Sequence, residues 1–309
     1  MSQVPVYRKR EYLSYSTLLS FARCPRRYFY QKCGISQTEE APALSYGTAM
    51  HKAIDVAISG GLDAAMAAFN SVWDDRLADS KRSRERARQQ LQHFIHHHSQ
   101  GRSLYERLPA PSVTNTTADS SLKLDDSVSP LEIPFAIDIG LPVPLMGRLD
   151  GWCRHRDTGD LWGFEFKTAS RLGSGLFDCL ELNPQVLTYA LVLKTLTGER
   201  IRGIMYEAML IDPKKVDSLT HPVMVQDHHV DAVLLWLRYY GSLLLACEER
   251  GEFPQNFSAC SAYPHFYMPG SHCEYENLCR VPDWRDMVGY YTIRPEHSMT
   301  KLTVEGAST

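Results

Sequence analysis

Three charged residues in the middle of the chain have the types and the spacing needed to bind a divalent cation. Asp150 ends one predicted strand, and Glu165 and Lys167 lie on the next, after a turn of sequence DTGD. Residues two apart on a strand point to the same face, and hairpin pairing can bring Asp150 beside the other two. Two converging carboxylates repel each other unless a cation lies between them, and oxygen ligands favour Mg²⁺ or Mn²⁺.

Such a group can support hydrolysis at a phosphoryl centre. A divalent cation lowers the pKa of bound water and stabilises charge on a phosphoryl group, and a neighbouring lysine orients the water or neutralises the developing charge. The alternative is an ordinary surface hairpin with salt-bridged charges. Phe164 and Phe166 alternate with the two charged residues of the second strand, so one face is apolar and the other is charged. This alternation favours a cleft.

The surrounding motifs resemble the RecB-like branch of the PD-(D/E)XK nuclease superfamily. Asp150 and the segment Glu165-Phe166-Lys167 match the superfamily's acidic and E-x-K elements. Gln185 and Tyr189 match its Q-x-x-x-Y motif on the following helix, where a spacing of four places both residues on one face. The resemblance implies that these two side chains support the site or contact DNA.

One further motif of that branch lies well upstream. His51, in Gly47-x-x-x-His51, resembles an upstream histidine that binds the metal from a helix. A lone helical histidine is more often structural, but its companion motifs reverse that preference. The resemblance therefore implies a Mg²⁺ or Mn²⁺ site with four ligands and a wider set of catalytic residues. The implied metal ligands are His51, Asp150, Glu165 and the backbone carbonyl of Phe166, and the catalytic set is Asp150, Glu165, Lys167, Gln185 and Tyr189.

Cysteines near the two ends of the chain form a second candidate site. Without a secretory signal a disulfide framework is improbable, and clustered thiols point to metal or iron–sulfur ligation. One early cysteine with three late ones resembles the iron–sulfur staple of CRISPR-associated adaptation nucleases and AddB-type nucleases, although the family's usual Cys-x-x-Cys spacing is tighter. The resemblance implies a [4Fe–4S] cluster, and the spacing alone leaves zinc open. The expected ligands are Cys24, Cys260, Cys273 and Cys279.

Several basic residues are weaker candidates for contacts with a DNA backbone. The run from Lys81 to Arg88 could follow phosphates, and a solvated helix face explains it equally well. Histidines at 93 and 96–98 read as a solvated run rather than a metal site. The candidate DNA-binding residues are Arg26, Arg27, Lys81, Arg82, Arg84 and Arg88.

The elements that must position these residues indicate a mixed α/β fold. Strands are predicted over 131–140, 144–155, 161–168 and 201–211, with helices over 14–33, from 46 onward, over 183–196 and over 230–250. We expect a PD-(D/E)XK restriction-endonuclease-like core sheet flanked by helices, as one RecB-like nuclease domain over 1–309. Residues 60–125 read as a helical and loop insertion, and 253–280 as the iron–sulfur staple segment closing on Cys24.

Composition excludes some classes of function. The chain has 309 residues, 44% hydrophobic and 22% charged, with 33 basic and 36 acidic side chains and a formal charge of -3. This balance is that of a soluble globular protein and excludes a global basic field, so nucleic acid must be bound locally. The N-terminal segment lacks the apolar core of a signal peptide, and the apolar stretch 230–247 is shorter than a typical membrane span. We expect a cytoplasmic protein with no membrane partner.

The function that the resemblance implies is metal-dependent DNA cleavage. The expectation is an exonuclease that hydrolyses phosphodiesters, acting on single-stranded DNA ends in recombination, repair or phage replication, similar to phage exonucleases. The alternative is a CRISPR adaptation nuclease, or a DNA-binding assembly subunit within a larger complex. The expected partner is therefore DNA, single-stranded or with free ends, together with recombination, CRISPR adaptation or phage replication proteins.

Overall fold

The computed structural model of the protein describes residues 11–36, 42–99, 104–117, 132–178, 180–260 and 273–293. These residues divide into two compact units. The first unit, here the cysteine unit, takes the described residues up to 36, residues 138–146, and those from 235 onward. The second, the sheet unit, takes those of 42–137 and 147–234. The mixed α/β class expected from the sequence is confirmed.

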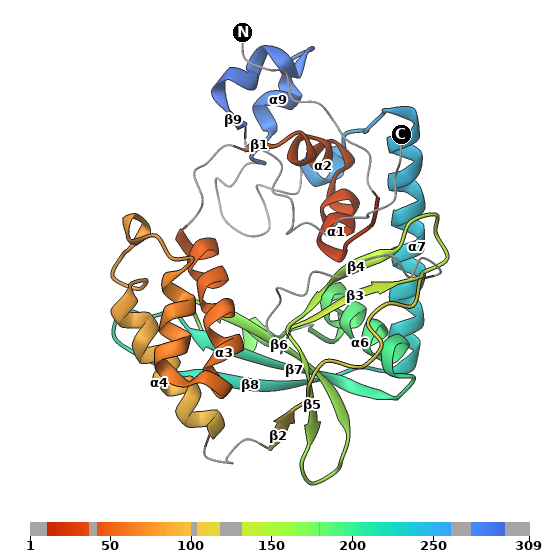
Figure 1. Ribbon diagram of the computed structural model, residues 1–309. Helices are drawn as coiled ribbons and strands as arrows, with labels where there is room; N and C mark the ends of the chain where they lie inside the picture. The colour runs from red at the N-terminus through yellow and green to blue at the C-terminus, as the bar shows by residue number, and fades with distance from the viewer. Residues whose placement is uncertain are drawn as a thin grey trace, which may run out of the picture. The chain divides into compact units, whose positions relative to one another are not determined.

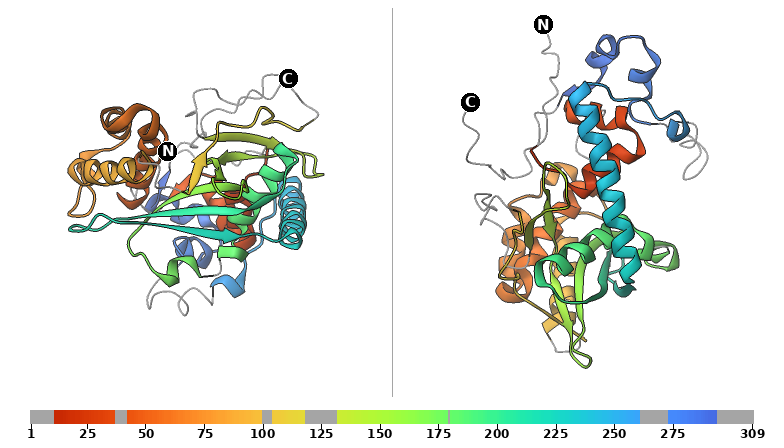
Figure 2. Two further views of the ribbon diagram at one scale, coloured as in Figure 1. Left: turned by 90° about the horizontal axis from the view of Figure 1, so that it is seen from below. Right: turned by 90° about the vertical axis from the view of Figure 1, so that its right-hand side faces the viewer.

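The sheet unit is built around five strands in the order β2-β5-β6-β7-β8. β6 (Leu161–Ala169) and β7 (Ile201–Leu210) are parallel, and the other described pairings of this sheet are antiparallel. Parallel neighbours need a crossover, and here it contains α6 (Pro184–Thr197). The long strands can be followed in Figures 1 and 2. The remaining strands are β2 (Tyr105–Arg107), β5 (Trp152–His155) and β8 (Ser218–Met224).

The start of α6 is fixed by local chemistry. The side chain of Asn183 accepts a hydrogen bond from the backbone N–H of Gln185 at 2.8 Å, and Pro184 occupies the first turn, where its missing N–H costs nothing. The helix ends at Gly198, whose φ of 69° is the left-handed conformation that suits glycine. Two short elements, α5 (Ser174–Phe177) and η2 (Leu180–Leu182), lie between β6 and α6.

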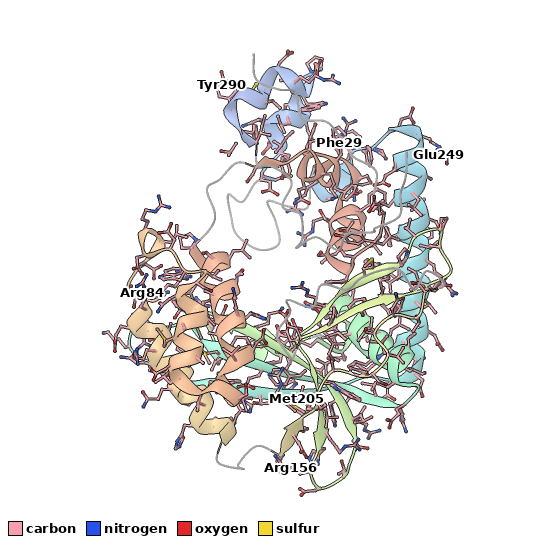
Figure 3. All side chains as sticks on the ribbon, in the orientation of Figure 1. Phe29, Arg84, Arg156, Met205, Glu249 and Tyr290 are labelled. Atoms are coloured by element: carbon pink, nitrogen blue, oxygen red, sulfur yellow. The ribbon has the colours of Figure 1, made fainter. Side chains whose placement is uncertain are left out.

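Two helices pack on the apolar side of the sheet. They are α3 (Pro42–Asn70), which is interrupted at Gly61 by a φ of 72°, and α4 (Arg84–Ser99), with η1 (Asp75–Leu77) between them. Figure 1 shows α3 and α4 side by side. Their core includes Phe164, Phe166 and Met205, and Figure 3 labels Met205 in β7. Phe164 and Phe166 therefore lie on the side of the sheet that α3 and α4 cover.

A separate pair of strands lies between β2 and β5 in the chain. β3 (Ile133–Ile137) pairs with β4 (Leu145–Leu149), and Ile133, Phe135 and Leu145 are buried. The chain then turns at Gly151, with a φ of 142°, before entering β5. This turn divides the single strand expected over 144–155 into two strands that belong to different sheets.

The cysteine unit is mostly helical. Its aromatic core includes Tyr30, Tyr275 and Leu278, and the Tyr275 hydroxyl donates to the carbonyl oxygen of Ile35 at 2.9 Å. The short strands β1 (Ile35–Ser36) and β9 (Thr292–Ile293) pair antiparallel. Its helical elements are α1 (Tyr15–Arg23), α2 (Pro25–Lys32), α9 (Glu276–Arg280), η3 (Trp284–Tyr290) and most of α7 (Asp227–Arg250).

The helix α7 is, by length and composition, apolar enough to cross a membrane. A core helix of a soluble protein passes the same test, so this is weak evidence for a membrane. Leu237 and Leu244 are buried, while Leu235 is 70% exposed and Tyr239 is 58% exposed. The helix expected over 230–250 is therefore present, with apolar residues both on its buried side and on its exposed side.

Three other regions differ in detail from the elements expected from the sequence, and in two of them a proline explains the difference. The helix expected over 14–33 is two helices, because Pro25 begins a new one after Cys24 adopts an extended conformation. β8 is not predicted by the sequence, because its Pro222 argues against a strand; an edge strand tolerates proline. The insertion expected over 60–125 contains the end of α3, η1, α4 and β2, and residues 118–125 lie outside the described residues.

Candidate active site

Glu165 and Lys167 lie on β6, facing away from α3 and α4. Their neighbour Phe166 packs on the opposite, apolar side. The Glu165 side chain is 1% exposed, and its Oε1 forms an ion pair with the Lys167 ammonium group. The sequence expectation that the two residues share a face agrees with this geometry; Glu165 is buried on that face, while the Lys167 side chain is 35% exposed.

Asp150 reaches this pair from the turn between β4 and β5. Its Oδ2 accepts a hydrogen bond from the backbone N–H of Phe166 at 2.8 Å. Asp150 also interacts electrostatically with both Glu165 and Lys167. The structure therefore brings together the two carboxylates and the lysine that the sequence singles out.

His51 approaches the same place from α3. Its Nδ1 lies 3.6 Å from Oδ2 of Asp150, and its ring packs edge-on against Phe166 with centroids 5.2 Å apart. Burial lowers the pKa of His51, and Lys167 acts in the same direction; Asp150 and a backbone hydrogen bond with Phe166 oppose this. A low pKa favours the neutral imidazole, the form that binds metals.

Gln185 and Tyr189 complete the group from α6. The Gln185 side-chain amide donates to Oε1 of Glu165 at 2.8 Å and to the Tyr189 hydroxyl at 3.1 Å. Oε1 of Glu165 thus has two partners, the amide and the ammonium group of Lys167. The spacing of four residues on α6 places Gln185 and Tyr189 on the face directed at β6, as the sequence indicates.

The electrostatics show a site with surplus negative charge. Burial and the charge of Asp150 raise the pKa of Glu165, although Lys167 opposes the shift. Burial lowers the pKa of Lys167, but the carboxylates of Glu165 and Asp150 outweigh it, so the net shift is upward. The pair therefore holds protons more tightly than isolated side chains do, which is the environment that a divalent cation would relieve.

The donor set fits a hard divalent cation. Oε2 of Glu165 is buried and has no hydrogen-bond partner within the described chain. An orphaned buried carboxylate oxygen beside a second carboxylate matches the oxygen ligands of Mg²⁺ and Mn²⁺. As they stand, no three His, Cys, Asp or Glu side chains among the described residues are arranged around one ion. The expected ligands would thus have to adjust, as Glu165 is held by Lys167 and Gln185.

Three further residues lie near the candidate active site and are not indicated by the sequence. Tyr206 of β7 pairs in register with Glu165, and burial raises the pKa of its phenol to about 12; Lys167 opposes this shift, while Glu165 and Asp150 add to it. Glu132 lies 3.5 Å from Arg148 and interacts electrostatically with Asp150. Arg107 contacts the backbone of Asp150. No motif marks these residues, because strand pairing rather than spacing along the chain places them here.

The four expected cluster cysteines lie in the cysteine unit. Cys24 is buried, Cys273 and Cys279 are partly buried, and Cys260 is exposed. Burial raises the pKa of the Cys279 thiol to about 11; a Tyr30 hydrogen bond opposes this, and Cys273, Cys24 and Cys260 each raise it further. The four thiols are thus near enough to interact, although they do not surround a common ion position.

The candidate DNA-binding residues are largely engaged with acidic partners. Arg27 pairs with Glu274 at 2.9 Å, Arg82 with Asp79 at 2.5 Å, and Arg84, labelled in Figure 3, with Asp75 at 3.0 Å. Their charge is partly neutralised within the protein, so their contact with DNA stays a prediction. The others are Arg26, whose backbone N–H donates to Pro254, and Lys81 and Arg88, both exposed.

The fold and this group of residues point to a class of enzyme, and a comparison with protein families agrees. The PD-(D/E)XK nuclease superfamily model matches residues 12–280, so the chain belongs to that superfamily. No curated protein matches the sequence. Among solved structures, a match is found to a protein from Eubacterium rectale named "Putative exonuclease". It has 12% sequence identity and a TM-score of 0.47, over 88% of this chain and 94% of the other.

Proposed function

We propose that this protein is a Mg²⁺- or Mn²⁺-dependent exodeoxyribonuclease of the RecB-like branch, acting on single-stranded DNA ends. The observation that carries the proposal is the orphaned, buried Oε2 of Glu165 beside Asp150 and Lys167. Within a nuclease superfamily, a buried carboxylate beside a second carboxylate and one lysine has the oxygen ligands that a divalent cation prefers. A purely structural or assembly subunit would not need this costly arrangement.

Each residue of the group has a distinct role in the proposed reaction. His51, Asp150, Glu165 and the backbone carbonyl of Phe166 would hold the cation, which supplies an activated water and neutralises charge on the phosphoryl oxygens. Lys167 lies on the reacting side of β6 and orients the attacking water or neutralises the developing charge. Gln185 fixes the rotamer of Glu165, and Tyr189 in turn holds Gln185.

The experiment is a cleavage assay on matched DNA substrates. End-labelled linear single strands, linear duplexes and circular single strands are incubated with the protein in chelator, Mg²⁺ or Mn²⁺. We expect no cleavage in chelator, release of short products from linear single strands with either metal, and no cutting of circles. Cleavage of circles would replace the exonuclease with an endonuclease, and full activity in chelator would overturn metal dependence.

We also propose that the cysteine unit binds a [4Fe–4S] cluster through Cys24, Cys260, Cys273 and Cys279, with zinc as the competing occupant. The support is the mutual electrostatic interaction of the four thiols across a long stretch of chain. The backbone N–H of Asn256 donates to the sulfur of Cys24 at 3.5 Å. Chemical analysis for iron, sulfide and zinc in anaerobically purified protein decides between cluster, zinc and neither.

A further inference from the structure

Arg107 is an enclosed cation next to the candidate active site. It is the last residue of β2, and its guanidinium carbon lies 4.0 Å from the centroid of the Phe164 ring. Its Nε and Nη1 atoms are buried and have no hydrogen-bond partner within the described chain. Burying a charge with unsatisfied donors is costly, so this arginine needs an explanation.

The contacts of Arg107 point to Asp150. Its Nη2 donates a hydrogen bond to the backbone carbonyl oxygen of Asp150 at 2.5 Å. Burial acts against its charge, while the carboxylates of Asp55, Asp150 and Glu207 favour it. Glu207 is itself fully buried and lies 2.9 Å from Nε2 of His98. The histidine run of α4 is therefore not wholly solvated, because its last member faces this charged cluster.

The helix α3 provides one residue that lies near Asp150 and one that faces Arg107. His51 and Asp55 are one turn apart and therefore lie on the same face of α3. His51 approaches the Asp150 carboxylate, while Asp55 faces Arg107, which holds the Asp150 carbonyl. The next residue, Gly151, turns the chain with a φ of 142°, and its carbonyl oxygen accepts a hydrogen bond from the Phe164 N–H at 2.9 Å. Arg107 holds the carbonyl oxygen before it, that of Asp150.

We propose that Arg107 is a positioning residue that sets the Asp150 peptide, and through it the carboxylate that receives the divalent cation. The inference rests on the proposed function of this site. Arg107 does not touch DNA in this scheme, because its charge is enclosed between Phe164 and the carboxylates. Groups that orient a metal ligand typically change metal affinity by about 10- to 100-fold when removed.

The test is Mn²⁺ binding, measured by titration calorimetry without DNA. Arg107→Met keeps an unbranched side chain of similar length and removes the charge and the donor, and we expect Mn²⁺ to bind about 10- to 100-fold more weakly. Arg107→Lys should recover part of the loss, since it restores the charge. The metal-dependence of cleavage should shift in parallel.

Arg86 provides a matched control in the same unit. Its Nη2 also donates to backbone carbonyls, of Asp212 at 2.6 Å and of Lys215, and its Nε is likewise buried without a partner. Arg86→Met should lower the melting temperature and leave Mn²⁺ affinity unchanged. Equal losses of affinity in the two methionine variants would overturn the inference and leave Arg107 a structural residue.

A second variant covers the case in which Arg107→Met does not fold. Asp55→Asn preserves the side-chain volume and removes the charge that faces Arg107, and a several-fold loss of Mn²⁺ affinity is expected. If folded Asp55→Asn and a folded Arg107 variant both bind Mn²⁺ as tightly as the wild type, the inference about Arg107 is overturned and the proposed function is unaffected. If the wild-type protein binds no Mn²⁺ and cleaves nothing, the proposed function fails and the inference with it.

Discussion

The carboxylates of the sheet unit and the thiols of the cysteine unit both place groups that can become negatively charged close together. The two regions differ in how the protein holds these groups in place. Both gather groups that become negatively charged, and both show pKa values raised by burial and by neighbouring ligands. In the sheet unit, backbone and side-chain hydrogen bonds already hold Asp150 and Glu165. These two carboxylates are therefore held in place by the protein itself, although the set of expected ligands must still adjust to surround one ion.

The thiols have much less support of that kind. Cys260 is exposed, and a side-chain amide lies 3.7 Å from its sulfur, a long contact even for sulfur. The ligands also come from residues at the two ends of the chain, so closing them together has a large entropic cost. Under the proposals above, the carboxylates of the sheet unit are held by its own hydrogen bonds, and an ion or cluster bound by the thiols would add to the stability of the cysteine unit.

The largest expected effect is a loss of cleavage activity in the sheet unit without a loss of stability. Asp150→Asn should lower the cleavage rate by at least about 1,000-fold, because it weakens the cation that stabilises the transition state. The melting temperature should stay close to that of the wild type, as the amide can still accept from the Phe166 N–H. Cleavage assays with circular dichroism melts measure both, and Asp160→Asn, in the exposed turn before β6, is the control.

The cysteine unit should behave in the opposite way. Cys24→Ala should lose bound metal and destabilise the unit by several kcal/mol, as breaking a long-range covalent link does. Limited proteolysis and metal analysis measure the loss, and cleavage activity should fall only indirectly. Cys33, which packs in the same unit without belonging to the four, is the matched control. Equal protease sensitivity in Cys24→Ala and Cys33→Ala would show that burial, and not metal ligation, explains Cys24.

A smaller effect is expected for the lysine of the catalytic group. Lys167→Ala should slow cleavage about 100- to 1,000-fold with little change in DNA affinity, because its proposed role is at the water and the developing charge. Single-turnover rates and binding titrations separate the two quantities. A parallel loss of binding and rate would instead make Lys167 a phosphate anchor.

The sequence predicts that several of these side chains of the sheet unit come together, because much of the geometry that joins them is local. Glu165 and Lys167 share a face through the two-residue repeat of a strand, and the helix predicted over 183–196, capped by Asn183 in the structure, fixes the position of Gln185. Hairpin geometry then brings Asp150 within reach. Each step needs only neighbouring residues and standard element geometry.

Other features could not be predicted because they depend on pairing between distant segments. Arg107 lies on a three-residue strand whose partner, β5, follows much later in the chain. Tyr206 lies on a strand that the sequence predicts, yet only the parallel register of β7 against β6 places it beside Glu165. A periodic pattern says which side of a strand is buried, and it does not say which strand lies next to it.

The smallest expected effect concerns the stability of the sheet unit without metal. The folded-state pKa of Glu165 is raised above the ordinary value of 4.5. A raised carboxyl pKa gives a stability contribution that is fully present below the unfolded pKa and is lost as the pH rises through the folded pKa. In chelator, the melting temperature of the wild type should therefore fall as the pH rises from about 5 through neutrality.

The variant Glu165→Gln tests directly whether ionisation of Glu165 lowers the stability of the metal-free protein. Glutamine cannot ionise, and its side-chain oxygen can still accept the hydrogen bond from Gln185, so the variant avoids the cost of a buried charge beside Asp150. At pH 8 in chelator we expect it to be more stable than the wild type by about 1 kcal/mol or more, since one pKa unit corresponds to about 1.4 kcal/mol. Excess Mg²⁺ should reverse the order, because only the wild type gains from binding the cation.

The control for general pH effects is Glu199→Gln, an exposed position in the same unit. It should follow the wild type at every pH, with and without metal. If Glu165→Gln were instead less stable than the wild type in chelator across the whole range, the ion pair with Lys167 would outweigh the repulsion from Asp150. The sheet site would then be stable with its charges as they stand, and the contrast with the cysteine unit would rest on hydrogen bonding alone.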